Sequence, residues 1–86
     1  MSLKLSERQQ QVLQCVKDAK AEKRRPNTAS LTVRMKRKGH AITEKQCAYD
    51  LGVIIRTKGT GVMSFKPTGM RTMWIYNENN AQEANQ

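Results

Sequence analysis

Long apolar runs are absent from this 86-residue chain, in which no stretch approaches the roughly 18 residues that a membrane-spanning helix requires. The opening residues, MSLKLSERQQ, also lack the apolar segment of a signal peptide. We therefore expect a soluble, intracellular protein of the cytoplasm that has no membrane partner. If its source is bacterial, we expect it to be associated with the nucleoid.

Cysteine and histidine are scarce as well. Cys15 and Cys47 are far apart and have no companion at metal-ligand spacing, which argues against a disulfide framework or a zinc site. We expect both to be small buried side chains. The single histidine, His40, follows Gly39 and is expected in a turn. Because the sequence holds no paired carboxylates, no nucleophile with a base and no metal motif, it predicts neither an enzyme nor a cofactor or metal site.

Acidic residues are few, with 7 Asp and Glu against 16 Lys and Arg, so the formal net charge is +9. No acid lies between Glu22 and Glu44, and none lies between Asp50 and Glu78, whereas cations occur in both intervals. Such unbalanced positive charge indicates an anionic partner, most commonly nucleic acid. An anionic membrane surface would instead require a long amphipathic helix with bulky apolar residues, which the sequence does not contain.

The first predicted helix begins at the sequence SERQ, where Ser6 and Gln9 can form a capping box. Apolar residues then recur at the spacing of one buried helical stripe, and Pro26 disfavours helix at the residue before it. The stripe consists of Val12, Leu13, Val16 and Ala19.

A second, shorter helix is predicted after the sequence PNT, capped by Asn27 or Thr28. Leu31 and Met35 are spaced to point inward, and Gly39 can end the helix in a left-handed conformation. No clear strand separates this helix from the first.

The third predicted helix begins at TEKQ, residues 43–46, which is a second capping box. Cys47, Ala48 and Leu51 form its expected inner stripe. The other side is expected to hold Lys45, Gln46, Tyr49 and Asp50. The sequence leaves residues 53–57 open between helix and strand, although the β-branched cluster at 53–55 favours strand.

A β-hairpin is predicted at the end of the domain, from the runs GVMSFK and MRTMWIY around KPTG. Pro67 suits position i+1 of a type I turn, and Gly69 suits the positive φ that follows. We expect Trp74 and Tyr76 to pack against the first helix. Paired aromatics exposed on the sheet would instead indicate RNA or single-strand binding.

Methionines supply much of the remaining apolar material, because aromatic residues make up only 5% of the chain. Met63, Met70 and Met73 are interpreted as core filler, with an adaptable protein-binding surface as the alternative. The sequence therefore predicts one domain over residues 1–76, followed by a polar, disordered tail over residues 77–86.

The order of three helices and a hairpin, with four residues (GHAI) between the second and third helices, resembles the winged helix-turn-helix superfamily of DNA-binding domains. LSERQQQVLQCV is similar to the opening helix of winged-helix repressors, and RRPNTASLTVRM to their entry into the second helix. TEKQCAYDLG corresponds to the recognition helix and GVMSFKPTGMRTMWIY to the wing. The resemblance, over residues 3–77, implies a small α+β winged helix with a C-terminal β-hairpin wing.

The same resemblance implies three groups of DNA-binding residues. The recognition helix would place Lys45, Gln46 and Tyr49 in the major groove, with Gln46 in a bidentate contact to adenine and Lys45 on guanine or phosphate. The second helix would hold phosphates through a clamp of Arg34, Lys36, Arg37 and Lys38. The wing would contribute Lys66, Thr68 and Arg71.

We therefore expect a duplex-DNA-binding protein, most simply a bacterial or phage transcriptional regulator, whose affinity falls with salt at a slope of about −5 or steeper if six or more phosphates are engaged. Two other partners stay open at this point. One is RNA or the ribosome, and the other is an acidic protein docked on a winged-helix interaction module. A homodimer also stays open.

Overall fold

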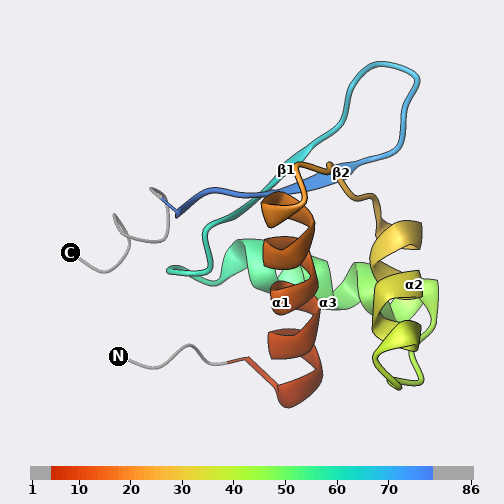
Figure 1. Ribbon diagram of the computed structural model, residues 1–86. Helices are drawn as coiled ribbons and strands as arrows, with labels where there is room; N and C mark the ends of the chain where they lie inside the picture. Colours follow the sequence, from red (N-terminus) through yellow and green to blue (C-terminus); the bar gives the residue numbers. More distant parts are fainter. Residues whose placement is uncertain (1–4, 79–86) are drawn as a thin grey trace.

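Three helices followed by an antiparallel hairpin make up the structure, a computed structural model that describes residues 5–78 (Figure 1). The helices are α1 (Glu7–Ala21), α2 (Thr28–Arg37) and α3 (Glu44–Arg56), and the strands are β1 (Val62–Phe65) and β2 (Met73–Tyr76). Helices α1 and α2 stand next to each other, α3 crosses behind α1, and the hairpin lies over the C-terminal end of α1 (Figure 1). This arrangement confirms the predicted α+β fold class and is consistent with a small winged-helix layout.

Each helix begins with a reciprocal capping motif. The side chain of the N-cap residue accepts a hydrogen bond from the third helical N–H, and the side chain at that third position bonds back to the N-cap N–H. All six hydrogen bonds are between 2.9 and 3.1 Å long. The pairs are Ser6 with Gln9, Asn27 with Ser30, and Thr43 with Gln46. Two of these boxes were predicted, and Asn27 is the cap of the second helix.

Helices α1 and α2 end in the same hydrogen-bonded motif, but with different residues. Gly39 has φ +89°, as predicted, and the His40 N–H donates to the carbonyl of Met35 at 3.0 Å. At the end of α1 the left-handed position is occupied by Lys23 (φ +61°), and the Arg24 N–H donates to the carbonyl of Ala19 at 2.9 Å. A lysine in that conformation is strained relative to glycine.

Helix α3 continues through Gly52 to Arg56, so the tendency of residues 53–57 toward strand was misleading. Tertiary packing overrides the β-branched preference, because Ile54 is fully buried one turn after Leu51. The expected inner stripe was also wrong at Ala48, which is exposed. Cys47, Leu51 and Ile54 form the buried stripe instead.

The core lies where the three helices meet the inner face of the hairpin. The predicted α1 stripe is confirmed, together with the inward positions of Leu31 and Met35. Cys15 and Cys47 are free and fully buried, as expected, and burial raises the pKa of both thiols. The other main core residues are Leu5, Ile42, Leu51, Ile54, Val62 and Trp74.

The hairpin is shorter and its loop longer than the sequence predicted. Strand β1 pairs with β2 from Val62 opposite Tyr76 to Phe65 opposite Met73, which leaves residues 66–72 as the loop. Gly69 has φ +75°, as expected, but the Met70 N–H donates to the carbonyl of Pro67 at 3.1 Å. Pro67 is therefore the first residue of this turn and not the second.

A short segment between α1 and α2 pairs with the edge of β2 through one isolated bridge, although the sequence showed no clear strand there. Asn27 forms an isolated antiparallel bridge with Met73, and the Trp74 N–H donates to the carbonyl of Pro26 at 2.9 Å. The Trp74 indole is 8% exposed, and its Nε1 donates to Thr28 Oγ1 at 3.0 Å. Trp74 is therefore buried, and Tyr76 is partly buried against the core, as expected of residues that pack under the first helix.

The outer face of the hairpin is apolar and exposed, which corrects the interpretation of the methionines. Met63 and Phe65 point away from the helices, and Met70 in the loop is 58% exposed. Only Met73 is half-buried. Residues 79–86 of the predicted tail lie outside the described residues, but the N–H of Asn77 donates to the carbonyl of Gly61 at 2.7 Å, so the ordered chain extends beyond residue 76.

Candidate nucleic-acid interface

The start of α3 presents three predicted contact residues to solvent. Lys45, Gln46 and Tyr49 are all exposed, with Tyr49 at 64%. However, Gln46 Oε1 accepts the hydrogen bond from the Thr43 N–H at 3.0 Å. A bidentate contact to adenine needs that carbonyl as well as the NH₂ group. Such a contact would therefore compete with the cap of α3 for that oxygen, whereas the NH₂ donors of Gln46 are available without that cost.

Asp50 does not lie on the exposed side of α3, where the sequence pattern placed it. Its side chain is fully buried and accepts from Arg8 through Nε at 2.7 Å and Nη2 at 3.0 Å. Gln9 Nε2 donates to the same carboxylate at 3.3 Å. The acid is thereby removed from the outward surface of α3, whose remaining acidic residue is Glu44. An acidic side chain on that surface would repel phosphate, and burial of Asp50 leaves Glu44 as the acid of α3 that could do so.

The loop of the hairpin, residues 66–72, is called the wing loop below. This loop, the start of α2 and the start of α3 meet around one open hollow of about 530 Å³. Arg71 bridges two of these elements, because its Nη1 lies 3.9 Å from Glu44 Oε1. Both side chains are mostly exposed, so the ion pair contributes little to stability. Lys66 also lines the hollow, and Thr68 lies exposed in the same loop. The fold therefore brings Lys66 and Arg71, two of the three predicted wing residues, to the beginning of the predicted recognition helix.

The four clamp residues of α2 divide into two pairs. Arg34 donates to both carboxylate oxygens of Glu22 at 2.9 Å, and Lys38 donates to Asp18 at 3.1 Å. These contacts turn both cations toward the end of α1. Lys36 and Arg37 are exposed, and neither forms an ion pair within residues 5–78.

These contacts also perturb the two acids. The hydrogen bonds from Gln14 and Lys38 lower the pKa of Asp18, and the contact with Arg34 lowers the pKa of Glu22. Both carboxylates therefore stay ionised to a lower pH than free carboxylates do, and the two cations remain paired over that range.

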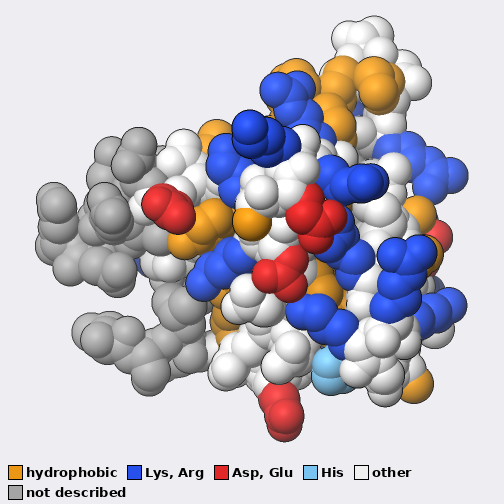
Figure 2. All heavy atoms as spheres, viewed as in Figure 1, with side chains coloured by type: hydrophobic (Ala, Val, Ile, Leu, Met, Phe, Trp, Pro, Cys, Tyr) orange, Lys and Arg blue, Asp and Glu red, His pale blue; other side chains and the backbone are white. Residues whose placement is uncertain are grey.

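Sequence reasoning did not assign Arg24 and Arg25 to a site, although both lie in the acid-free interval before Glu44. Together with Arg34 and Arg37, they line a polar hollow of about 770 Å³ at the α1–α2 corner. This hollow shares no lining residue with the one beside the wing. Figure 2 shows Lys and Arg side chains down the α2 side and near the base of the hairpin, whose end carries apolar groups.

Among the residues that the structure describes, no group of three or more His, Cys, Asp or Glu side chains could hold a metal ion. Within the same residues, no helix is long and apolar enough to cross a membrane. Comparison of the chain with protein-family models, curated proteins and solved structures gave no significant match.

Proposed function

We propose that this chain is a non-enzymatic, duplex-DNA-binding protein of the winged-helix type that regulates transcription in a bacterium or phage. The observation that supports this most is the convergence of the wing loop with the starts of α2 and α3 around one hollow. Lys66 and Arg71 of the loop line this hollow together with Glu44 of α3, and Lys45 is the exposed residue that follows Glu44 on that helix. Helix N-termini and cations together suit the phosphates on either side of a major groove.

In this proposal α3 enters the major groove. Lys45 and Tyr49 contact base edges, with Gln46 limited to its NH₂ donors, and Lys66, Thr68 and Arg71 contact the backbone from the wing. Lys36 and Arg37 supply phosphate contacts from α2. Arg34 and Lys38 contribute less than the charge count of the sequence suggested, since each is already paired with an acid of α1.

The salt dependence of binding tests this division of the cations. Four phosphate contacts, from Lys36, Arg37, Lys66 and Arg71, give a slope of log K against log salt of about −3.6. A slope of −2 or shallower would mean that most of these cations do not face the duplex.

Selection from a pool of random duplexes at moderate salt tests the function itself. Enrichment of one motif supports a specific regulator, and an inverted repeat in that motif would indicate a homodimer. Binding without enrichment would leave only a non-specific role on DNA. A preference for structured RNA in competition, or no nucleic-acid binding at all, would refute the proposal.

Two matched variants test the mechanism, because Lys45→Ala and Lys36→Ala remove the same charge from exposed positions on different helices. We expect Lys45→Ala to alter the preferred sequence, and Lys36→Ala to weaken all sequences alike and reduce the salt slope by about 1. If both variants weaken all sequences equally, α3 does not read bases.

A further inference from the structure

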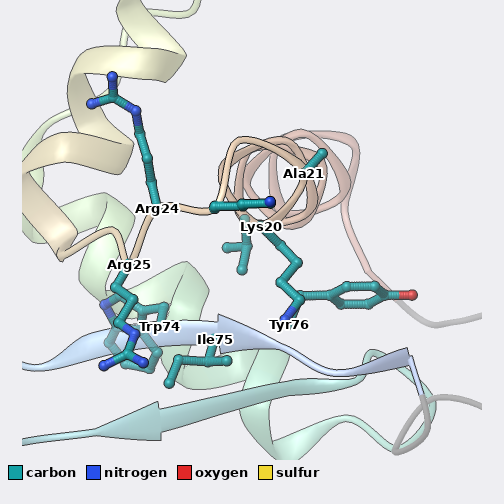
Figure 3. Close-up of a pocket in the computed structure, with 9 residues that line it drawn as sticks. Lys20, Ala21, Arg24, Arg25, Trp74, Ile75 and Tyr76 are labelled. Carbon is teal, nitrogen blue, oxygen red and sulfur yellow. The ribbon is translucent and has the colours of Figure 1, made fainter.

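A third recess lies away from the wing hollow, between the C-terminal part of α1 and strand β2 (Figure 3). It shares Arg24 and Arg25 with the polar hollow at the α1–α2 corner. It encloses about 480 Å³ and shares no lining residue with the hollow assigned to DNA. Its floor is apolar, formed by Val16 of α1 and by Trp74, Ile75 and Tyr76 of β2. The proposed DNA contacts leave this recess unused.

Among the described residues, the rim of the recess carries four cations and no acid, and Glu78 lies in an adjoining hollow that shares Lys20, Ile75 and Tyr76 with it. Lys20 projects over β2 from α1, and Arg25 lies beside Trp74 and Ile75, whereas Arg24 extends to the other side of the loop (Figure 3). The nearest acid along the chain, Glu22, contacts Arg24 and Arg34 and is not part of the lining. An occupant of this recess must therefore combine apolar groups with negative charge.

The edge of β2 is open along the same recess. The Trp74 N–H points away from β1, because it donates to the carbonyl of Pro26. In an antiparallel strand the residue two positions later directs its N–H and C=O to the same side. Tyr76 therefore presents both groups to that edge, where the segment at Pro26 no longer runs beside β2, and no described residue pairs with them there.

These three features identify the kind of ligand. A duplex offers phosphates but no apolar group that could reach the floor. Stacking of a free base is disfavoured, because Trp74 is 8% exposed and the Lys17 ammonium lies over the Tyr76 ring, 5.3 Å from its centroid. An extended peptide offers apolar side chains, carboxylates and main-chain hydrogen bonds together.

We propose that this recess binds an acidic, apolar segment of a partner protein, in an extended conformation that adds a strand to β2 at Tyr76. Ile75 and Tyr76 are successive strand residues that face opposite sides of the hairpin, so apolar side chains of the segment contact one or the other according to register. Its carboxylates then lie near Lys20 or Arg25. The recess and the wing hollow have no lining residue in common. The proposal does not depend on DNA binding.

The test uses the full chain and a fluorescein-labelled peptide, Glu-Leu-Glu-Phe-Glu-Leu-Glu. Its alternation presents apolar groups and carboxylates in either register. We expect Arg25→Glu to weaken peptide binding about tenfold, and Lys45→Glu, which makes the same charge change on α3, to alter it less than about twofold. Replacing the apolar residues of the peptide with Ser, or its central Phe with Pro, should also abolish binding, since Pro cannot pair with a strand edge.

Amide hydrogen exchange of the complex tests the strand addition directly. The Tyr76 amide should gain protection when peptide is bound, and the amides of the wing loop should not. If Arg25→Glu and Lys45→Glu weaken binding equally, the peptide is held only by general attraction between charges, and the proposal is overturned. Displacement of the peptide by a single-stranded oligonucleotide, with the same dependence on Arg25, would assign the recess to nucleic acid instead. None of these results depends on whether the chain binds duplex DNA.

Discussion

The buried contact between Arg8 and Asp50 should make a large contribution to stability, since it connects the first turn of α1 to the middle of α3. The Asp50 carboxylate is fully buried and accepts three hydrogen bonds, two from Arg8 and one from Gln9. In Arg8→Ala the carboxylate would keep only the long bond from Gln9. An uncompensated buried charge of this kind costs about 3 to 5 kcal/mol.

The expected loss is smaller than that range, because the Arg8 side chain is 40% exposed and water can approach the carboxylate once the guanidinium is gone. We therefore expect Arg8→Ala to lower the free energy of unfolding by about 2 to 3 kcal/mol. A domain of this size has roughly 4 to 11 kcal/mol in total. The midpoint of thermal unfolding should fall by about 10 to 20 °C.

Urea unfolding followed by the fluorescence of Trp74, the single tryptophan and a buried one, measures this loss. Arg37→Ala is the matched control, because Arg37 is exposed and forms no ion pair within residues 5–78, and it should change stability by less than about 0.5 kcal/mol. In an Asp50→Asn background, Arg8→Ala should cost much less, since no buried charge is then left unpaired. Equal costs in the two backgrounds would refute this explanation.

Three further changes test other parts of the structure. Lys23→Gly should raise the free energy of unfolding by about 0.5 to 1 kcal/mol in urea unfolding, because relief of the left-handed strain exceeds the added chain entropy. The pKa of Asp18 is lowered by Gln14 and Lys38, so its contribution is present above pH 3.8, the ordinary carboxyl value, and is lost as the pH falls below it. Asp18→Asn should therefore flatten the stability profile in that acid range. Glu44→Gln should strengthen duplex binding several-fold in a fluorescence titration, and weaker binding would contradict the proposed orientation of α3.

Helix starts were predictable from the sequence, because a capping box is a contact between residues three positions apart. The SERQ and TEKQ segments each form the expected pair of hydrogen bonds. The positive φ at Gly39 and Gly69 was predictable for a similar reason, since the backbone conformation of a single residue favours glycine there. These positions established the order of the helices and the place of the hairpin.

Features decided by contacts across the chain were not predictable in the same way. Burial of a carboxylate at position 50 of α3 depends on pairing with Arg8, which is 42 residues away. The extension of α3 beyond Gly52 depends on burial of Ile54 in a core that several elements build. The recess beside β2 arises because the chain brings Arg25 next to Ile75, and neither residue signals that proximity in the sequence.

The distribution of acids changes how the positive charge of the chain should be counted. Asp18 and Glu22 neutralise two of the four cations at the end of α2, and Asp50 is buried against Arg8. The strongest charge run in the sequence is therefore partly balanced in the fold. The less conspicuous cations, Lys66 at the wing and Arg25 beside β2, form no ion pair within the described chain. Binding of anions should accordingly depend on Lys36, Arg37 and these scattered positions more than on Arg34 and Lys38.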